Sequence, residues 1–415
     1  MTSSEIKALD AENVMQTYGR FDAVIERGEG ATLYSPEGKE YIDFSSGIGV
    51  CSIGYGNKGW ADAIYAQALK LQHISNLYYS EPYAKLAAQL IERTGMKNVV
   101  FFSNAGGEAN EGMIKLARKY SFDKYGRGRS TIVSLVQSFH GRTITTLAAT
   151  GQEVFHNYFF PFTEGFRHVP ANDIKALEDM LDAYSAVAVN SGTSALKPIT
   201  PIDSVCGVLV ELIQGEGGVL PLDPGYVKEV ARLCADRDLL LLVDEVQTGA
   251  GRTGALFAYQ QYGIAPDVVS FAKGIAGGLP MGGFMANGKC ASVLVPGTHA
   301  TTFGGNPVAA AGALEVLRQL DDAALSEVAK KGEYIREKIK GWNIPVVGEI
   351  RGMGLMIGVS LRGAAPKEAA KACVRDGLLI LTAGDDALRM LPPLTITYGE
   401  IDKGLNILER VLSKT

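Results

Sequence analysis

Two short apolar runs in the second half of the chain each end in a charged residue. Residues 239–243 (LLLLV) are followed by Asp244, and residues 268–272 (VVSFA) are followed by Lys273. Apolar runs of this length, bounded by polar and glycine residues, are typical of strands buried on both faces of a parallel sheet. Parallel strands end at the same edge of a sheet, where α/β proteins bind ligands, so the pattern predicts that Asp244 and Lys273 meet there.

Hydrophobic spacing predicts further strands and helices along the chain. Residues 30–44 alternate around a turn at 36–39, which indicates a hairpin in a small peripheral sheet. Apolar residues with helical spacing predict a helix over residues 60–71. Together the elements indicate an α/β protein. The same criteria predict helices over 83–91, 112–120 and 307–320, and strands over 98–102, 131–136 and 205–211.

Length, composition and charge set bounds on the class of protein. With 415 residues and 47% hydrophobic content, the chain can bury a large core, and we expect two domains. Its formal net charge of −5 gives no sign of a basic face, which argues against nucleic acid as a partner. We therefore expect small molecules and a second copy of the chain as partners.

Cysteine usage and the absence of long apolar runs predict the compartment. The five cysteines are scattered without a Cys-x-x-Cys pair, which argues against a zinc site and against a disulfide framework. We expect no metal and a reducing environment. Residues 1–15 mix charged residues with few large apolar ones, unlike a signal peptide, and no apolar run reaches membrane-spanning length. These features predict a cytoplasmic protein without membrane contact.

The acid and the amine expected at the sheet edge form the pair that pyridoxal phosphate chemistry requires. Lys273 can supply an amine for a Schiff base, and Asp244 a carboxylate that keeps the pyridine nitrogen protonated. Taken singly, Asp244 could be a cap and Lys273 a solvated charge. The glycine-rich residues 274–278 leave the Lys273 amine open to a ligand, and this favours a catalytic pair.

A glycine-rich turn before a predicted helix offers a phosphate site. Residues 103–111 read SNAGGEANE and follow a predicted strand. Free backbone amides and the positive end of a helix attract a phosphate group. An ordinary turn is the alternative. The presence of Asp244 and Lys273 favours the phosphate site, with the amides of Gly106 and Gly107 as contacts.

The segment around the acid and the lysine resembles a protein family. Residues 244–254 read DEVQTGAGRTG, and Lys273 is followed by GIAGGLP. In these motifs, and in others in the same order along residues 18–412, the chain is similar to the class III, fold type I pyridoxal phosphate aminotransferases, the acetylornithine and 4-aminobutyrate aminotransferase family. The resemblance implies a large domain, with a mostly parallel sheet flanked by helices, and a smaller α+β domain. We expect 1–60 to join the small domain, 61–309 to form the large domain and 310–415 to complete the small one.

The resemblance assigns residues to the cofactor, pyridoxal phosphate. Phe139, in SFHGRT, matches the residue on one face of the ring, and Val246 the residue on the other face. Gln247 matches the residue that hydrogen-bonds the phenolic oxygen. Ala105 stands where relatives often carry Ser, which leaves the phosphate to the glycine amides. The expected cofactor-binding residues are Gly106, Gly107, Phe139, Asp244, Glu245, Val246, Gln247, Lys273 and Thr302, of which Asp244 and Lys273 are also expected to be catalytic.

Further motifs match substrate-binding residues of the family. Arg142 is placed to hold a substrate carboxylate through two parallel bonds. Glu216, in QGEGG, matches a residue that in relatives pairs with a C-terminal arginine, here Arg389, which binds the α-carboxylate of the oxo acid. Thr301 and Thr302 begin a loop that in relatives crosses a dimer interface to the partner's phosphate. The resemblance thus implies a homodimer and substrate contacts from Arg142, Glu216, Thr301 and Arg389.

The family implies ping-pong transamination through the Lys273 Schiff base. An amine donor gives up its terminal amino group, which 2-oxoglutarate accepts in the second half-reaction. The expected donor is N2-acetyl-L-ornithine, giving N-acetyl-L-glutamate 5-semialdehyde and L-glutamate in arginine biosynthesis. 4-Aminobutyrate, succinylornithine and ornithine stay open as donors, because the pocket changes that separate such substrates are worth only about 1–3 kcal/mol.

Two other motifs point to different classes of protein. Residues 249–254 (GAGRTG) satisfy the Gly-x-Gly-x-x-Gly pattern of nicotinamide and flavin oxidoreductases, but residues intervene after the strand and no clear helix follows. Residues 283–290 nearly match a P-loop, but Cys290 stands where a Ser or Thr is needed. A non-catalytic binding protein is a third alternative. The intact pair of Asp244 and Lys273 argues against it.

Two segments carry no functional assignment. Residues 186–204 look longer than the corresponding family segment, and we predict a surface loop there. His73 lies in the sequence HISNLYY. A histidine in such a segment is more often a satisfied structural residue than a base, so His73 has no catalytic role in this prediction.

Overall fold

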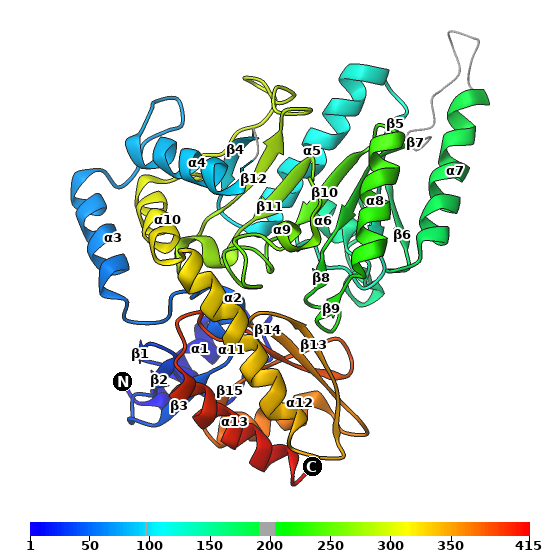
Figure 1. Cartoon of the computed structure of the whole chain (residues 1–415). Coiled ribbons are helices and arrows are strands. Elements are labelled where there is room, and N and C mark those ends of the chain that lie inside the picture. The colour runs from blue at the N-terminus through cyan, green and yellow to red at the C-terminus, as the bar shows by residue number, and fades with distance from the viewer. Residues whose placement is uncertain (96–97, 191–203) are drawn as a thin grey trace.

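The computed structural model describes residues 1–95, 98–190 and 204–415 of the chain. Its upper part in Figure 1 is a seven-stranded sheet with helices packed against it, and its lower part holds two four-stranded sheets together with further helices. The predicted α/β class is therefore confirmed. The carboxyl ends of the central strands in the upper part face the lower part.

The seven-stranded sheet is mostly parallel, as predicted. Parallel pairing joins β11 to β10, β10 to β7, β7 to β5 and β5 to β6. By contrast, β12 runs antiparallel to both of its neighbours, β11 and β4. β12 is thus the reversed strand of this sheet. In order across the sheet the strands are β4 (Asn98–Ser103), β12 (Gly282–Asn287), β11 (Val268–Phe271), β10 (Leu240–Asp244), β7 (Ser204–Val210), β5 (Arg129–Leu135) and β6 (Phe166–Val169).

The continuous apolar runs arise because both faces of this sheet are covered. Along β10, Leu240 and Leu242 belong to one buried cluster, and Leu241 and Val243 to another. The first cluster includes residues of α5 (Gly106–Tyr125) and α6 (Ile144–Ala149), and the second includes residues of α4 (Glu81–Thr94), α7 (Ile174–Asn190), α8 (Pro224–Asp236) and α10 (Pro307–Gln319). Successive strand residues point to opposite faces, so every residue of the run is buried.

The helices predicted over 60–71, 83–91 and 307–320 are present in the upper part, which also holds helices that were not predicted. Three of the helices in this part begin with a proline in the first turn, which suits helix starts because its missing N–H would be unpaired there. The helices and helical turns, in chain order from the N-terminus, are α1 (Ser3–Asn13), α2 (Ser46–Gly49), α3 (Lys58–Lys70), α4 (Glu81–Thr94), α5 (Gly106–Tyr125), α6 (Ile144–Ala149), η1 (Glu153–Phe155), α7 (Ile174–Asn190), α8 (Pro224–Asp236), α9 (Tyr259–Tyr262), η2 (Lys273–Ala276) and α10 (Pro307–Gln319).

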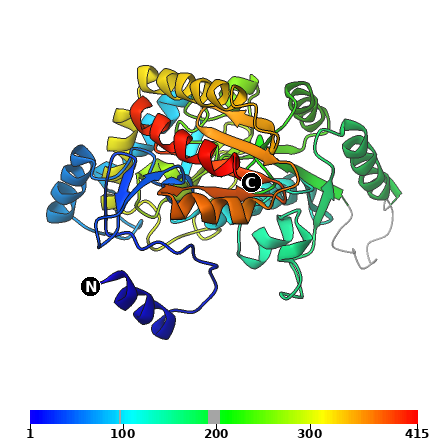
Figure 2. The ribbon, with the colours of Figure 1, turned by 90° about the horizontal axis from the view of Figure 1, so that it is seen from below.

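The lower part combines residues from both ends of the sequence. β15 pairs in parallel with β3, with Leu378 opposite Ile42. In Figure 2, α11 and α13 cross this part, and α1 stands apart from the body. These contacts support the proposed grouping of 1–60 with 310–415. The remaining elements are β1 (Arg27–Glu29), β2 (Thr32–Tyr34), β3 (Glu40–Asp43), α11 (Asp322–Lys340), β13 (Val347–Met353), β14 (Met356–Leu361), α12 (Pro366–Arg375), β15 (Leu378–Leu379), β16 (Leu381–Ala383), β17 (Ala387–Met390) and α13 (Tyr398–Leu412), with a separate hairpin of β8 (Ile213–Gln214) and β9 (Leu220–Pro221).

Two predictions of local structure need correction. The helix after the glycine-rich turn begins at Gly106 and not at Gly112, because Gly106 and Gly107 already belong to the helix. The loop predicted over 186–204 is wrong at its first residues, since α7 continues to Asn190, and Ser204 already belongs to β7. Residues 191–203 lie outside the described part of the chain. The predicted hairpin at 30–44 is confirmed by the antiparallel pairing of β2 and β3.

The two nucleotide-binding patterns lack the structure that their function needs. Residues 283–287 lie within β12, so the P-loop-like sequence forms a strand and not a loop before a helix. After the glycines at 249–254, the next helix, α9, has four residues. A dinucleotide site requires a helix that starts directly after such glycines.

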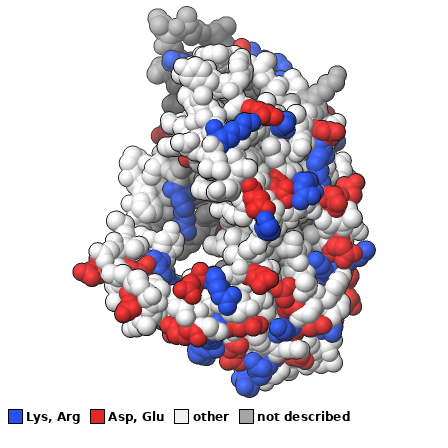
Figure 3. Space-filling model, turned by 90° about the vertical axis from the view of Figure 1, so that its left-hand side faces the viewer, with Lys and Arg blue, Asp and Glu red and all other residues white. Residues whose placement is uncertain are grey.

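The surface and the thiols complete this description. Within the described ranges, no helix combines the length and the apolar character that crossing a membrane requires. All five cysteines are free thiols. On the face in Figure 3, acidic and basic side chains are interspersed.

Candidate active site

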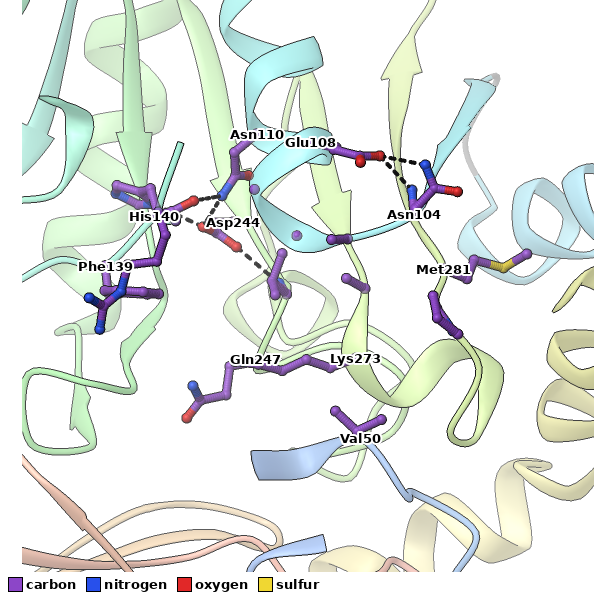
Figure 4. Close-up of a pocket in the computed structure, with 18 of the residues that line it drawn as sticks. Val50, Asn104, Glu108, Asn110, Phe139, His140, Asp244, Gln247, Lys273 and Met281 are labelled. Carbon is purple, nitrogen blue, oxygen red and sulfur yellow. Dashed lines mark hydrogen bonds and ion pairs between the residues drawn. The ribbon is translucent and has the colours of Figure 1, made fainter. Parts of the chain in front are cut away.

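A cavity of about 710 Å³ lies at the carboxyl ends of the central strands. Asp244 is the last residue of β10, and Lys273 follows the end of β11. Figure 4 shows both side chains directed into this space. The predicted meeting of the two residues is thus seen in the structure. Of the expected site residues, Gly106, Gly107, Phe139, Arg142, Asp244, Val246, Gln247 and Lys273 line the cavity.

The Asp244 carboxylate is held in place from several sides. Oδ2 accepts a hydrogen bond from Asn110 Nδ2 at 2.7 Å and lies 2.8 Å from His140 Nδ1. Oδ1 accepts from the backbone N–H of Val246 at 3.0 Å. Only 4% of Asp244 is exposed. The carboxylate therefore has one orientation and a negative charge screened little by water.

His140 and Asn110 were not predicted as site residues. Asn110 lies in the first turns of α5, and its Nδ2 also donates to the backbone carbonyl of His140 at 2.7 Å. His140 follows Phe139 in the turn after β5. The available signal was a polar residue on an otherwise apolar buried helix face, because such a group must find a partner. Both residues fix the direction of the Asp244 carboxylate.

Lys273 is partly buried, and the pKa of its amine is lowered. Burial lowers this pKa, the charge of Glu216 opposes the effect, and the charge of Arg389 adds to it. The backbone of Lys273 has a φ of +47°, which a residue with a β-carbon adopts only under strain. The depressed pKa increases the neutral fraction of the amine, which is the form that attacks a carbonyl.

The first turn of α5 is open to an anion. Its N-cap residue, Ala105, offers no side-chain hydrogen bond to the turn. A β-carbon on Gly106 would lie 2.7 Å from Val246 Cγ1, so only glycine allows the backbone to approach Val246 this closely. Uncapped amides at the positive end of a helix form an anion site. This is the place where the sequence predicted a phosphate.

Aromatic rings hold the Arg142 guanidinium at the cavity wall. Its Cζ lies 4.3 Å from the centre of the Phe155 ring and 5.5 Å from that of Phe139. The two rings meet edge to face at 5.6 Å. A cation over ring faces is attracted by their negative electrostatic potential. Phe155, in the short helix η1, is another residue that the sequence did not reveal.

Glu216 and Arg389 form an ion pair beside the cavity. Arg389 Nη1 lies 2.7 Å from Glu216 Oε1 and also donates to Gly215 O and Gln247 Oε1, both at 3.1 Å. Burial raises the pKa of Glu216, but the charge and the hydrogen bond of Arg389 outweigh it, so that the pKa is lowered overall. The predicted pair is present. Neither residue lines the cavity, but Arg389 donates to Gln247, which does line it.

Besides Glu216 and Arg389, three more expected site residues, Glu245, Thr301 and Thr302, lie away from the cavity lining. Glu245 is fully buried, and its carboxylate accepts from the backbone N–H groups of Ala258 and Tyr259. This carboxylate therefore supports a loop behind the site. Thr301 Oγ1 accepts from the N–H of Gly304 at 3.2 Å, whereas Thr302 is exposed.

Comparison with known proteins gives a consistent result over the whole length. The family described as aminotransferase class-III matches residues 14–412. Acetylornithine aminotransferase of Haemophilus ducreyi is 48% identical over 415 residues, which cover 100% of both chains. Among solved structures, ornithine aminotransferase of Toxoplasma gondii has a TM-score of 0.90 at 30% identity, with 100% of this chain and 95% of that chain covered. Acetylornithine aminotransferase of Elizabethkingia anophelis has a TM-score of 0.85 at 28% identity, with 100% of both chains covered.

Proposed function

The chain belongs to the class-III aminotransferase family, and we propose that it transfers the terminal amino group of N2-acetyl-L-ornithine to 2-oxoglutarate. The products are N-acetyl-L-glutamate 5-semialdehyde and L-glutamate, a step of arginine biosynthesis. Relatives that are 48% and 44% identical over almost their full length carry the name acetylornithine aminotransferase. The observation that carries the chemistry is the meeting of Lys273 and Asp244 in one cavity.

We propose pyridoxal phosphate as the cofactor, because the cavity offers a partner for each of its parts. The amides of Gly106 and Gly107 suit the phosphate. Phe139 and Val246 line the cavity as covers for the ring faces, and Asp244 suits the ring nitrogen. Bound there, pyridoxal phosphate supplies an aldehyde that condenses with amines and a ring that accepts electrons.

Lys273 is the residue proposed to move the proton. The lowered pKa of its amine leaves a neutral base that can take a proton from the substrate carbon. Asp244 cannot turn away, since His140, Asn110 and the Val246 N–H hold it. Its charge therefore stays where a protonated ring nitrogen needs it. Gln247 lines the same cavity and is proposed to hydrogen-bond the phenolic oxygen.

Two arginines are proposed to let one cavity accept both substrates. The donor has one carboxylate and a neutral amide, whereas 2-oxoglutarate has two carboxylates. Arg142 lines the cavity and can hold the carboxylate common to both. Glu216 neutralises Arg389 while the donor is bound and releases it when the second carboxylate of 2-oxoglutarate enters.

The donor assignment is tested by steady-state kinetics with four amines and 2-oxoglutarate. We expect kcat/KM to be highest for N2-acetyl-L-ornithine, ahead of succinylornithine, ornithine and 4-aminobutyrate. Discrimination is a difference in kcat/KM, so each amine is measured with the same holoenzyme. A higher kcat/KM for ornithine would assign the chain to the activity named for the Toxoplasma gondii neighbour.

We also propose a homodimer in which the Thr302 loop serves the partner's site. Phe303, beside Thr302, is 61% exposed, and its ring lies 5.3 Å from that of His73. Asn76 Nδ2 donates to Gly304 O at 2.9 Å, which joins the loop to residues 73–79. Leu77 in that segment is 87% exposed. Neighbouring exposed apolar side chains of this kind mark an interaction surface.

The dimer proposal is tested by mixing two defective variants. Lys273→Ala and a low-activity Thr302→Ala protein, unfolded and refolded together, should form hybrids in which both defects fall in one site and the other site is intact. Activity above either parent is expected. A protein that sediments as a fully active monomer would overturn this arrangement.

A further inference from the structure

Glu211 is a buried carboxylate in the cavity wall that no step above uses. It follows the last residue of β7, is 5% exposed and lines the cavity. Burial raises its pKa to about 7. The charge of His140 opposes this effect, and the charge of Asp244 adds to it. A buried acid is costly unless its hydrogen bonds are satisfied. The buried position of the Glu211 carboxyl group therefore needs a structural or functional explanation.

The two oxygens of Glu211 bind two different segments. Oε2 accepts from the backbone N–H of Phe139 at 2.8 Å, and Oε1 accepts from that of Gly215 at 3.2 Å. Phe139 lies in the turn after β5, and Gly215 lies between β8 and β9. A carboxylate is the side chain that can accept at both ends at once, since an amide must present a donor at one of them.

Each of these segments carries a group of the proposed reaction. The Phe139 ring covers the place proposed for the cofactor and borders Arg142. Gly215 lies between Glu211 and Arg389, because its N–H donates to Glu211 and its carbonyl accepts from Arg389 Nη1 at 3.1 Å. The next residue, Glu216, is the partner of Arg389. Glu211 thus joins the ring-covering turn to the turn that holds the ion pair.

We propose that Glu211 is a positioning residue that keeps the Phe139 turn and the Gly215–Glu216 turn in register across the cavity. The inference rests on the proposed function, since it assigns roles to Phe139 and Arg389. Loss of either hydrogen bond leaves a buried N–H without a partner and breaks the link between the two turns, so that neither turn is held in place by the other. Binding of the cofactor and binding of 2-oxoglutarate should then weaken together.

The test compares Glu211→Gln with a matched control, Glu400→Gln. Glu400 also joins two segments through its two oxygens, accepting from the N–H of Ala31 and from that of Thr397, both at 2.9 Å. It lies outside the cavity lining. Both substitutions keep the side-chain volume. Apo protein of each variant is titrated with pyridoxal phosphate, and KM for 2-oxoglutarate and the melting temperature are measured on the holoenzymes.

Glu211→Gln is expected to raise the Kd for pyridoxal phosphate and the KM for 2-oxoglutarate by about tenfold each, the effect of one unsatisfied buried donor. Glu400→Gln should lower the melting temperature without changing either constant. Unchanged constants in Glu211→Gln, or equal changes in both variants, would overturn the proposal. The titration needs no amine donor, so a wrong donor assignment leaves its result intact.

A second variant covers a failure of Glu211→Gln to fold. Glu211→Asp keeps the charge and both acceptors but is one methylene shorter, so that it reaches at most one of the two N–H groups well. We expect a raised Kd for pyridoxal phosphate in this variant also. A Kd equal to that of the wild type would overturn the positioning role.

Discussion

Asp244 and Glu216 are two carboxylates that act on Lys273 from different surroundings. Both charges oppose the burial effect on the pKa of the Lys273 amine. Asp244 is 4% exposed, and its carboxylate is hydrogen-bonded to Asn110, His140, Ser270 and the N–H of Val246. The Glu216 side chain is 28% exposed, whereas Arg389, with which it pairs, is only 3% exposed. One carboxylate is fixed inside the protein, and the other stands at the border with solvent.

The difference in exposure indicates which partner of the ion pair can move. Arg389 is also held by the carbonyl groups of Gly215 and Gln247. Removing one partner from a buried, hydrogen-bonded charge pair costs about 2–5 kcal/mol, because the other charge stays unpaired. Glu216 can recover hydration when it leaves, and an entering carboxylate can replace it at Arg389. The buried carboxylate therefore suits the proposed cofactor, and the partly exposed one suits the proposed exchange of substrates.

Removal of the amine between the two carboxylates has the largest expected effect. Lys273→Ala should abolish turnover and the visible absorption band of the protein-bound cofactor, because no other group lies in its position. The control is Lys331→Ala, a lysine whose pKa is also lowered by burial but whose amine donates to Leu394 O in the lower part. Absorption and turnover of both variants are measured. A Lys273→Ala protein with the wild-type spectrum would disprove the assignment.

Neutralising the fixed carboxylate is the next strongest change. Asp244→Asn should still bind the cofactor but turn over at least about tenfold more slowly, since one pKa unit of support for the ring nitrogen is worth that factor. Asp267→Asn is the control, because Asp267 precedes β11 and accepts from the N–H of Leu241 at 2.9 Å. Equal turnover of Asp244→Asn and wild type would show that this carboxylate does not touch the ring nitrogen.

The proposed role of the Glu216–Arg389 ion pair is tested by separating the two half-reactions. Arg389→Ala should slow the half-reaction with 2-oxoglutarate by more than about tenfold, following the cost of an unpaired buried charge, and should affect the donor half much less. Arg142→Ala should impair both halves, because both substrates place a carboxylate there. Single-turnover spectra with donor alone and then acceptor alone give each rate. Equal slowing of both halves by Arg389→Ala would contradict the exchange.

Glu245 offers a milder comparison, because it is fixed like Asp244 but acts on stability. Burial raises its pKa from 4.5 to about 7, so between these values the unfolded chain loses its proton first. The stabilising contribution is therefore complete below about pH 4.5 and lost as the pH rises through about 7, amounting to at most about 3 kcal/mol. Denaturant titrations of wild type and Glu245→Gln from pH 5 to 8 measure it. A pH-independent difference would refute the raised pKa.

Neighbouring residues illustrate what local sequence can and cannot predict. Asp244 and Glu245 stand side by side and were both expected at the cofactor. The side chain of Asp244 enters the cavity, while that of Glu245 binds the N–H groups of Ala258 and Tyr259. The strand period of two predicts that consecutive side chains diverge. It does not predict which buried groups the second one meets.

The order of apolar and polar residues was enough to predict β4, β5, β7, β10 and β11 and the sheet edge at which Asp244 and Lys273 lie, but not β6 or β12. These features follow from the order of apolar and polar residues over a few positions, which sets local conformation and burial. The tertiary structure was needed to find that His140 and Asn110 contact Asp244 and that Glu211 joins two turns of the cavity wall. Asn110 and Asp244 are 134 positions apart in the sequence, and His140 and Asp244 are 104 positions apart. Contacts of this kind depend on how α5, β5 and β7 pack around the cavity, and no local pattern encodes that packing.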